Sequence, residues 1–420
     1  MSYYEYHVAR RYVQFEGALK ELANYATLVG HRILFLTACD PVREQVVAQI
    51  QSGMTTPARE CMNERLAQES QRYARYLSMS EQFDRERAVS EYEFYDLGET
   101  VVSEENIIKV ARYAGERHFD TVAGIGGGKA QDFARAITHI LPVHVILVPT
   151  LCATNASIST LSVLYSPDGG RIQQYWRMDN APDLVLVDTN LLVRNPPKML
   201  AAGIGDITAT YYEALCNLRM SGKTASIPVY AEEGIRLAIR VMREHAPAAM
   251  EAIRAQRTNR SFETVLSMIM HNPGPLGMIC LTGYAHMIDE MLLYFKQAHA
   301  TPHGLRVGYA TLAMLTVQNA EKQEMMEYLR FCRSVGIPLS LKALGLHDIS
   351  MKEWKEAYDA TLGVSGNAAS LPFRTSAQSI ISSVFEAERF VSAVDDSLFT
   401  DAFSDGNAQR SDHVETEEKV

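Results

Sequence analysis

The chain has 420 residues, 47% of them hydrophobic, and a formal net charge of −10 at pH 7, which predicts two or three domains with a sizeable core. The acidic balance, without a Lys/Arg-rich run, argues against a nucleic-acid partner, and no apolar run is long enough to cross a bilayer. The N-terminal segment lacks the apolar stretch of a secretory signal and the six cysteines show no CxxC spacing, so we expect a cytoplasmic protein with reduced thiols.

Four short apolar segments in the first half predict strands: HRILFLTACD (31–40), HFDTVAGIG (118–126), HVILVPT (144–150) and DLVLVDT (183–189). Their Val, Ile and Leu residues run continuously instead of alternating with polar ones, which indicates strands buried on both faces of a parallel sheet. Helical spacing between the second and third segments indicates a strand–helix–strand crossover. Residues 1–194 are therefore predicted to form a doubly wound α/β domain.

Residues 58–88 interrupt this pattern with a highly charged, helix-prone segment. The connection is longer than a helix and two short loops require. A solvated helical insertion is the favoured interpretation, and an element that binds a partner protein is the alternative.

From Asn195 to about residue 395 the chain shows helical patterns and almost no strand signal, and Pro196-Pro197 marks the predicted domain boundary. Residues 396–420 are polar and acidic, with few large apolar side chains, and are predicted to be disordered.

A glycine-rich strand-to-helix turn, GIGGGK, follows the second strand and contains Gly124, Gly126, Gly127 and Gly128. Bare backbone beside a helix N-terminus suits a phosphate or pyrophosphate, although a tight turn under a close-packed helix is the structural alternative. Two common phosphate-binding motifs do not match this segment. A P-loop would need glycine at Ala123 and a hydroxyl residue at Ala130, and the GxGxxG pattern would need glycine at Lys129.

Three side chains on separate segments are candidates for a metal site. Asp206 follows a glycine turn at a predicted helix start, where capping is the simpler interpretation. His286 lies in an apolar helical run, and His303 lies at a loop-to-helix entry. Each residue alone has an ordinary structural explanation, but one carboxylate and two imidazoles together make a plausible open site for a divalent cation, either zinc or ferrous iron.

The order of these motifs resembles the metal-dependent alcohol dehydrogenases of the iron-containing (group III) type, and within them the glycerol dehydrogenase-like branch. The similarity runs from GIGGGK through LSVLY, LVLVDT and LAAGIGD to a helical histidine and HGxxVxxxTL, and covers about residues 30–390. It implies an N-terminal NAD-binding α/β domain, a helical metal-binding domain over 195–395 and a cleft between them. Homo-oligomers are usual among such relatives, so we expect one here.

The resemblance also implies roles for individual residues. It assigns Asp206, His286 and His303 to the metal. It assigns the cofactor to Asp40, Gly126, Gly127, Gly128, Lys129, Asp132, Thr150, Ser159, Leu161 and Tyr165. Among these, Asp40 corresponds to the acidic residue that binds the ribose hydroxyls, which favours NAD over NADP.

Two departures from the family pattern lie beside the implied metal site. Asn155 replaces an aspartate that contacts substrate in glycerol dehydrogenases, which weakens the case for glycerol itself. Asp289 stands where the family often has a second histidine. We therefore consider both as candidate catalytic residues. Asp289 could accept a proton, orient a ligand or simply lie close.

The predicted function is hydride transfer between NAD and the CH–OH group of a small polyol or diol, with the metal activating the hydroxyl. One alternative is a reductase of the same fold that acts on a 2-hydroxy acid, a 2-oxo acid or another carbonyl compound. Phosphorylated substrates rank lower because Arg306 and Lys296 are the only basic candidates nearby. A second alternative is a non-catalytic relative that serves as a partner-binding subunit.

Overall fold

The computed structural model describes residues 9–38, 42–55, 89, 91–169, 171–221, 229–271, 283–362, 371 and 376–394. Asp40, the predicted insertion at 58–88 and the predicted tail at 396–420 lie outside these described residues. Within the described part, none of the helices combines the length and the apolar character needed to span a membrane.

A six-stranded parallel sheet forms one half of the molecule, with the strand order β1-β8-β5-β4-β2-β3. Its strands are β1 (Tyr12–Phe15), β2 (Arg32–Ala38), β3 (Glu91–Gly98), β4 (Thr121–Gly126), β5 (His144–Pro149) and β8 (Leu184–Asp188). The four predicted strands are the four central ones. The edge strands β1 and β3 were not predicted, because they are half-exposed and lack a continuous apolar run.

Successive residues of the central strands enter two different hydrophobic cores. In β2, Leu34 and Leu36 belong to the larger core, whereas Ile33 and Phe35 belong to the smaller one. Because a strand points alternate side chains to opposite faces, both faces of the sheet are covered. This explains the continuous apolar runs in the sequence and confirms the doubly wound α/β arrangement.

Short helices and one hairpin complete this half. The helices are η1 (Ala18–Glu21), α1 (Leu22–Ala26), α2 (Arg43–Thr55), α5 (Glu104–Glu116), α6 (Gly128–Ile137), η2 (Ala156–Ile158) and α7 (Thr189–Leu192). An antiparallel hairpin of β6 (Leu161–Tyr165) and β7 (Ile172–Arg177) projects from the sheet. The sequence did not predict this hairpin, because its strands are only partly buried and give a weak apolar signal.

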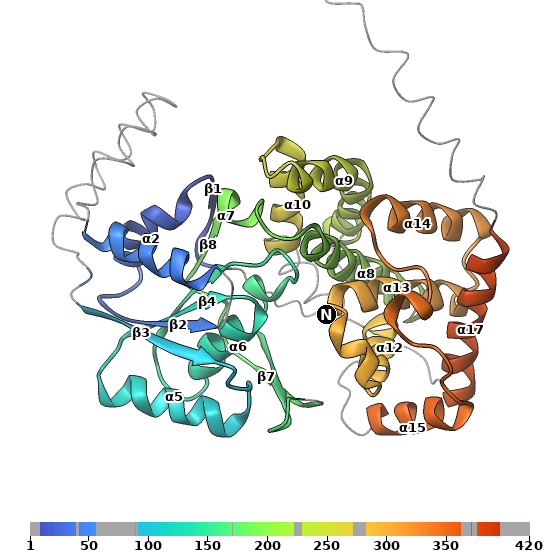
Figure 1. The fold of residues 1–420 in the computed structure, drawn as a ribbon, viewed down its shortest axis with the longest axis horizontal. Helices are drawn as coiled ribbons and strands as arrows, with labels where there is room; N and C mark the ends of the chain where they lie inside the picture. Colours follow the sequence, from blue (N-terminus) through green and yellow to red (C-terminus); the bar gives the residue numbers. More distant parts are fainter. Residues whose placement is uncertain are drawn as a thin grey trace, which may run out of the picture.

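The second half is helical, as predicted: among the described residues after β8 there is no strand. It comprises α8 (Pro197–Ser221), α9 (Val229–Arg254), α10 (Arg260–Met270), α12 (Tyr284–Leu292), η4 (Lys296–Ala300), α13 (His303–Val317), α14 (Lys322–Val335), η5 (Lys342–Leu344), α15 (Met351–Leu362) and α17 (Ala377–Ala393). In Figure 1 the sheet lies on the left and the helices α12 to α17 on the right, with α8 between them.

Candidate metal centre and its cavity

Asp206 lies in the interior of α8, which begins at Pro197, so the predicted capping position at a helix start is wrong. The glycines before it do not form a turn. They allow helices α8 and α13 to pack closely, because a Cβ on Gly205 would lie only 2.2 Å from the backbone oxygen of Gly304. This close crossing brings Asp206 next to His303, the first residue of α13.

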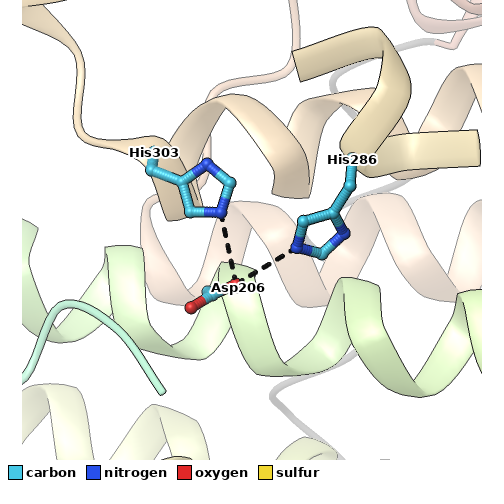
Figure 2. A group of neighbouring side chains, drawn as sticks. All are labelled: Asp206, His286 and His303. Atoms are coloured by element: carbon cyan, nitrogen blue, oxygen red, sulfur yellow. Dashed lines mark ion pairs between the residues drawn. The ribbon is translucent and has the colours of Figure 1, made fainter. Parts of the chain in front are cut away.

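The three predicted metal ligands converge from three helices (Figure 2). Their ligand atoms lie within 4.8 Å of one another. Asp206 Oδ1 is 3.5 Å from Nε2 of His286, on α12, and 3.5 Å from Nε2 of His303. Burial by itself raises the pKa of Asp206, but hydrogen bonds from the two histidines outweigh it and lower that pKa below its usual range.

The second oxygen of Asp206 is held by the loop that carries Asn155. The backbone N–H of Asn155 donates a hydrogen bond of 3.1 Å to Asp206 Oδ2. The orientation of the carboxylate is therefore fixed from the sheet half of the molecule as well as from α8.

Glu213 lies two turns after Asp206 on α8 and contacts both the ring and the backbone of His286. Its Oε2 lies 2.6 Å from His286 Nδ1, and its Oε1 accepts the backbone N–H of His286 at 2.8 Å. Burial lowers the pKa of His286, but the Glu213 carboxylate and then Asp206 outweigh it and raise that pKa well above its usual value.

Asp289 likewise contacts the ring atom Nδ1 of His303, and its other oxygen contacts Arg306. Its Oδ2 lies 2.7 Å from His303 Nδ1, and its Oδ1 accepts Arg306 Nε at 2.6 Å. Burial raises the pKa of Asp289, but Arg306 and His303 together lower it to about 2. Asp289 is thus an ionised carboxylate engaged by two partners.

The glycine turn joins β4 to α6 with very little space around it. A Cβ on Gly124 would lie 2.6 Å from the backbone oxygen of Ala130, and Gly126 has a φ of +153° that disfavours other residues. Lys129 is the second residue of α6 and donates to the carbonyl of Gly98 at 2.8 Å. The close packing predicted as a structural alternative is therefore present, and it leaves the N-terminus of α6 at the surface of a cavity.

Arg135, buried on α6, was not singled out from the sequence. It pairs with Asp132 at 2.7 Å and donates to the carbonyls of Ala156 and Leu161. Burial raises the pKa of Asp132 to about 6, against the opposing effect of Arg135. The Arg135 guanidinium thus links η2 and the start of β6 to α6.

One cavity of about 650 Å³ joins the glycine turn to the three converging side chains. It is lined by Asp206, His286, His303 and Asp289, and also by Gly128, Lys129, Asp132, Asn155, Ser159, Leu161 and Tyr165. The predicted cofactor residues Gly126, Gly127 and Thr150 are not among its lining residues. Asp40 lies outside the described residues.

The β6–β7 hairpin reaches across this cavity to α12. Tyr175 donates a hydrogen bond to Glu290, and both residues line the cavity. The guanidinium of Arg171 lies 5.6 Å from the ring centroid of Tyr294. The cavity is therefore bounded by elements from both halves of the molecule.

Spacing along a helix could have revealed the unpredicted site residues. Glu213 follows Asp206 by seven residues, and Arg135 follows Asp132 by three, so each pair shares a helix face. Glu213 and Arg135 were not predicted because each is also a residue type that is common in helices.

Residues 74–189 match the sequence model of the family described as iron-containing alcohol dehydrogenase. Glycerol dehydrogenase from Pseudomonas putida is 32% identical over 254 residues, which cover 60% of this chain and 69% of that enzyme. Glycerol dehydrogenase from Thermotoga maritima is 33% identical over 246 residues, which cover 56% of this chain and 65%, slightly under two thirds, of that enzyme.

Among solved structures, a probable glycerol dehydrogenase from Sinorhizobium meliloti 1021 aligns with a TM-score of 0.79. The alignment covers 94% of this chain and 100% of that one, at 22% sequence identity. At this identity the likeness establishes the fold, which agrees with the sheet and helices described above.

Proposed function

Because this chain belongs to the iron-containing alcohol dehydrogenase family, we propose that it is an oxidoreductase that transfers hydride between the CH–OH group of a small polyol or diol and NAD. One observation carries the proposal: a single cavity is lined both by the start of α6 and by Asp206, His286 and His303. A nicotinamide cofactor and a metal-activated hydroxyl would have to meet in such a cavity.

The donor set fits a divalent cation. One carboxylate oxygen and two imidazole nitrogens lie within 4.8 Å of one another, which leaves coordination positions open, and this set accommodates zinc or ferrous iron. Asp206, His286 and His303 would hold the ion. When bound, a divalent cation supplies a Lewis acid that lowers the pKa of an alcohol hydroxyl, and the nicotinamide ring supplies the hydride acceptor.

The chain's own residues would position the cofactor. The N-terminus of α6, at Gly128 and Lys129, offers backbone N–H groups and a positive dipole end for the pyrophosphate. Ser159, Leu161 and Tyr165 line the same cavity and would contact the rest of the cofactor. We propose NAD as the cofactor over NADP, because Asp40 corresponds to the acidic residue that binds the ribose hydroxyls in the related family.

Of the roles considered for Asp289, we favour orientation of His303 over proton acceptance. Its two oxygens accept from His303 and Arg306, and its pKa of about 2 makes it a weak base at neutral pH. Asn155 lines the cavity and is fixed near Asp206 by its backbone, and we propose that its side chain contacts the substrate.

Lys129, Arg177 and Arg306 line the cavity, and Arg306 is the one that contacts Asp289 beside the proposed metal ligands. A neutral substrate is favoured over a carboxylic acid at that position because Arg306 is already engaged. Its guanidinium donates to Asp289 and to the carbonyls of Ala298 and Thr301. A substrate carboxylate would have to displace these buried partners, which costs free energy.

Elemental analysis of the purified chain, together with NAD-linked assays on glycerol, 1,2-diols and 2-hydroxy acids, would test the proposal. We expect about one divalent cation per chain, diol oxidation that chelation abolishes, and recovery when zinc or ferrous iron is returned. Asp206→Asn should lose at least about 100-fold in kcat/KM, because it removes the only proposed anionic ligand. Chelator-resistant oxidation of every substrate would overturn the metal-dependent mechanism, and faster turnover of 2-hydroxy acids would overturn the polyol assignment.

We also propose a cytoplasmic homo-oligomer. Light scattering coupled to size-exclusion chromatography tests the assembly, and a monomeric mass at micromolar concentration would contradict it.

A further inference from the structure

Glu213 contacts His286 at two points and is fully buried. Its Oε2 lies 2.6 Å from the ring atom Nδ1, and its Oε1 accepts the backbone N–H at 2.8 Å. His286 is in the first turn of α12, where backbone N–H groups lack partners within the helix. One carboxylate on α8 therefore fixes both the helix start and the ring.

We propose that Glu213 is a positioning residue that holds His286 in the Nδ1–H tautomer, with the Nε2 lone pair directed at the cation beside Asp206. The inference rests on the proposed function, since it assigns a task at the same metal centre. Glu213 would not itself bind the cation, because its oxygens face the opposite edge of the imidazole ring.

The tautomer follows from hydrogen-bond chemistry. An ionised carboxylate only accepts hydrogen bonds, so Nδ1 must carry the proton that it donates to Oε2. Without a cation, Nε2 can donate to Asp206 Oδ1, which lies 3.5 Å away. A metal ligand must be the neutral imidazole, and with the proton held on Nδ1 the lone pair of that neutral ring is on Nε2. A partner that donated to Nδ1 would move the proton to Nε2 and remove the lone pair that a metal needs.

Charge in the buried cluster supports this assignment. Asp289, which orients the other histidine, shares its negative charge with Arg306. Among the described residues, by contrast, the ion pairs of Glu213 involve His286 and no lysine or arginine. With both histidines neutral, as metal ligation requires, three carboxylates (Asp206, Glu213 and Asp289) against one guanidinium leave two negative charges, which a divalent cation would neutralise.

Glu213→Gln tests the idea with almost no change in volume. The amide has one accepting oxygen and one donating nitrogen, so it cannot accept from both His286 donors. If its oxygen keeps the backbone N–H, its nitrogen faces Nδ1 and favours the wrong tautomer. We expect the affinity for Zn²⁺ and Co²⁺, measured by chelator competition on demetallated protein, to fall about 10- to 100-fold. The visible absorption of the Co²⁺-loaded protein should also change.

Glu388→Gln is the matched control. Glu388, on α17, is half-buried and accepts from Tyr309 Oη at 2.7 Å and from the backbone N–H of Leu341 at 2.9 Å, through one oxygen. The Glu388→Gln substitution removes a carboxylate from the same helical half and changes no contact of either histidine. We expect wild-type affinity for Co²⁺ and a wild-type Co²⁺ spectrum.

The outcomes separate this inference from the proposed function. A wild-type chain that binds neither Zn²⁺ nor Co²⁺ overturns the metal centre and this inference with it. Equal affinity and equal spectra for wild type and Glu213→Gln overturn the inference alone. If Glu213→Gln does not fold, ¹⁵N NMR of the zinc-loaded wild type labelled at histidine decides, since a His286 ring without a proton on Nδ1 refutes the assignment.

Discussion

At the scale of single residues, carboxylates outside the cavity hold backbone segments together. Asp188 accepts the backbone N–H groups of Gly17 and Leu19 at 3.0 Å each and caps α7. Asp120, before β4, accepts the backbone N–H groups of His31 and Arg32 at the start of β2. Each links segments far apart in the sequence, so each contributes to the sheet that carries the glycine turn.

Asp120 gives a prediction for the pH dependence of stability. Burial raises its pKa, but hydrogen bonds from His31, Thr121 and Arg32 outweigh it and leave the pKa below the ordinary 3.8. A lowered folded-state pKa stabilises the protein above the unfolded-state pKa, and this contribution disappears as pH falls through the folded-state value. Asp120→Asn should therefore lower the urea midpoint at pH 7, with a difference from wild type that shrinks below pH 3.8.

Urea titrations between pH 3 and 7 check this, with Asp179→Asn as the control. Asp179 is exposed, so its substitution should leave the midpoint within error at every pH. A difference between Asp120→Asn and wild type that stays constant over this range would contradict the prediction.

At the scale of elements, glycines set how closely helices approach their neighbours. Gly124 allows α6 to lie against β4, and Gly205 allows α8 to cross α13. Gly128 is different: a Cβ there would meet Thr154 Cγ2 at 3.6 Å, an ordinary contact, and the residue lines the cavity. Two glycines of the GIGGGK segment, one in β4 and one at the start of α6, thus have separate tasks, one in packing and one in keeping the cavity open.

Two alanine substitutions distinguish these tasks. Gly124→Ala should cost about 1–3 kcal/mol of unfolding free energy, because the new Cβ would lie 2.6 Å from the Ala130 oxygen and force α6 away. Gly128→Ala should leave the unfolding free energy within about 0.5 kcal/mol but raise the KM for NAD. Urea denaturation and steady-state kinetics measure both. A destabilised Gly128→Ala with normal KM would reverse the assignment.

At the scale of the whole molecule, hydrogen bonds join the two halves at the cavity and beside it. Asn155 donates to Asp206, Tyr175 donates to Glu290, and the Asn195 side chain bonds the backbone on both sides of Leu151. A cation bound to Asp206 would act on this junction as well as on the three helices. Ligand binding and global stability should therefore be linked.

Removal of the metal should lower the melting temperature of the whole chain. A ligand that binds only the native state adds about 2.7 kcal/mol when its concentration is 100 times its Kd. Differential scanning calorimetry of chelated and zinc-reloaded protein should show a reversible shift. In Asp206→Asn, zinc should shift the melting temperature little, and an equal shift in that variant would place the stabilising ion elsewhere.

The amino-acid sequence predicted the four central strands, and it also supplied the three residues that we propose as metal ligands. Strands buried on both faces, such as β4 and β5, leave continuous apolar runs because no face needs polar residues. The three proposed metal ligands could be named because a carboxylate and two imidazoles are chemically distinctive, and because the motif order resembled a known family. Such features can be read without knowing which segments touch.

The other features of the site depend on tertiary packing. It placed Asp206 inside α8 instead of at its start, because the preceding glycines serve a helix crossing that sequence spacing cannot reveal. It also joined Glu213 to His286 across 73 residues and extended the β6–β7 hairpin to α12. These contacts arise from packing between distant segments. The seven-residue spacing puts Glu213 on the same helix face as Asp206, but it does not show that His286 packs against that face.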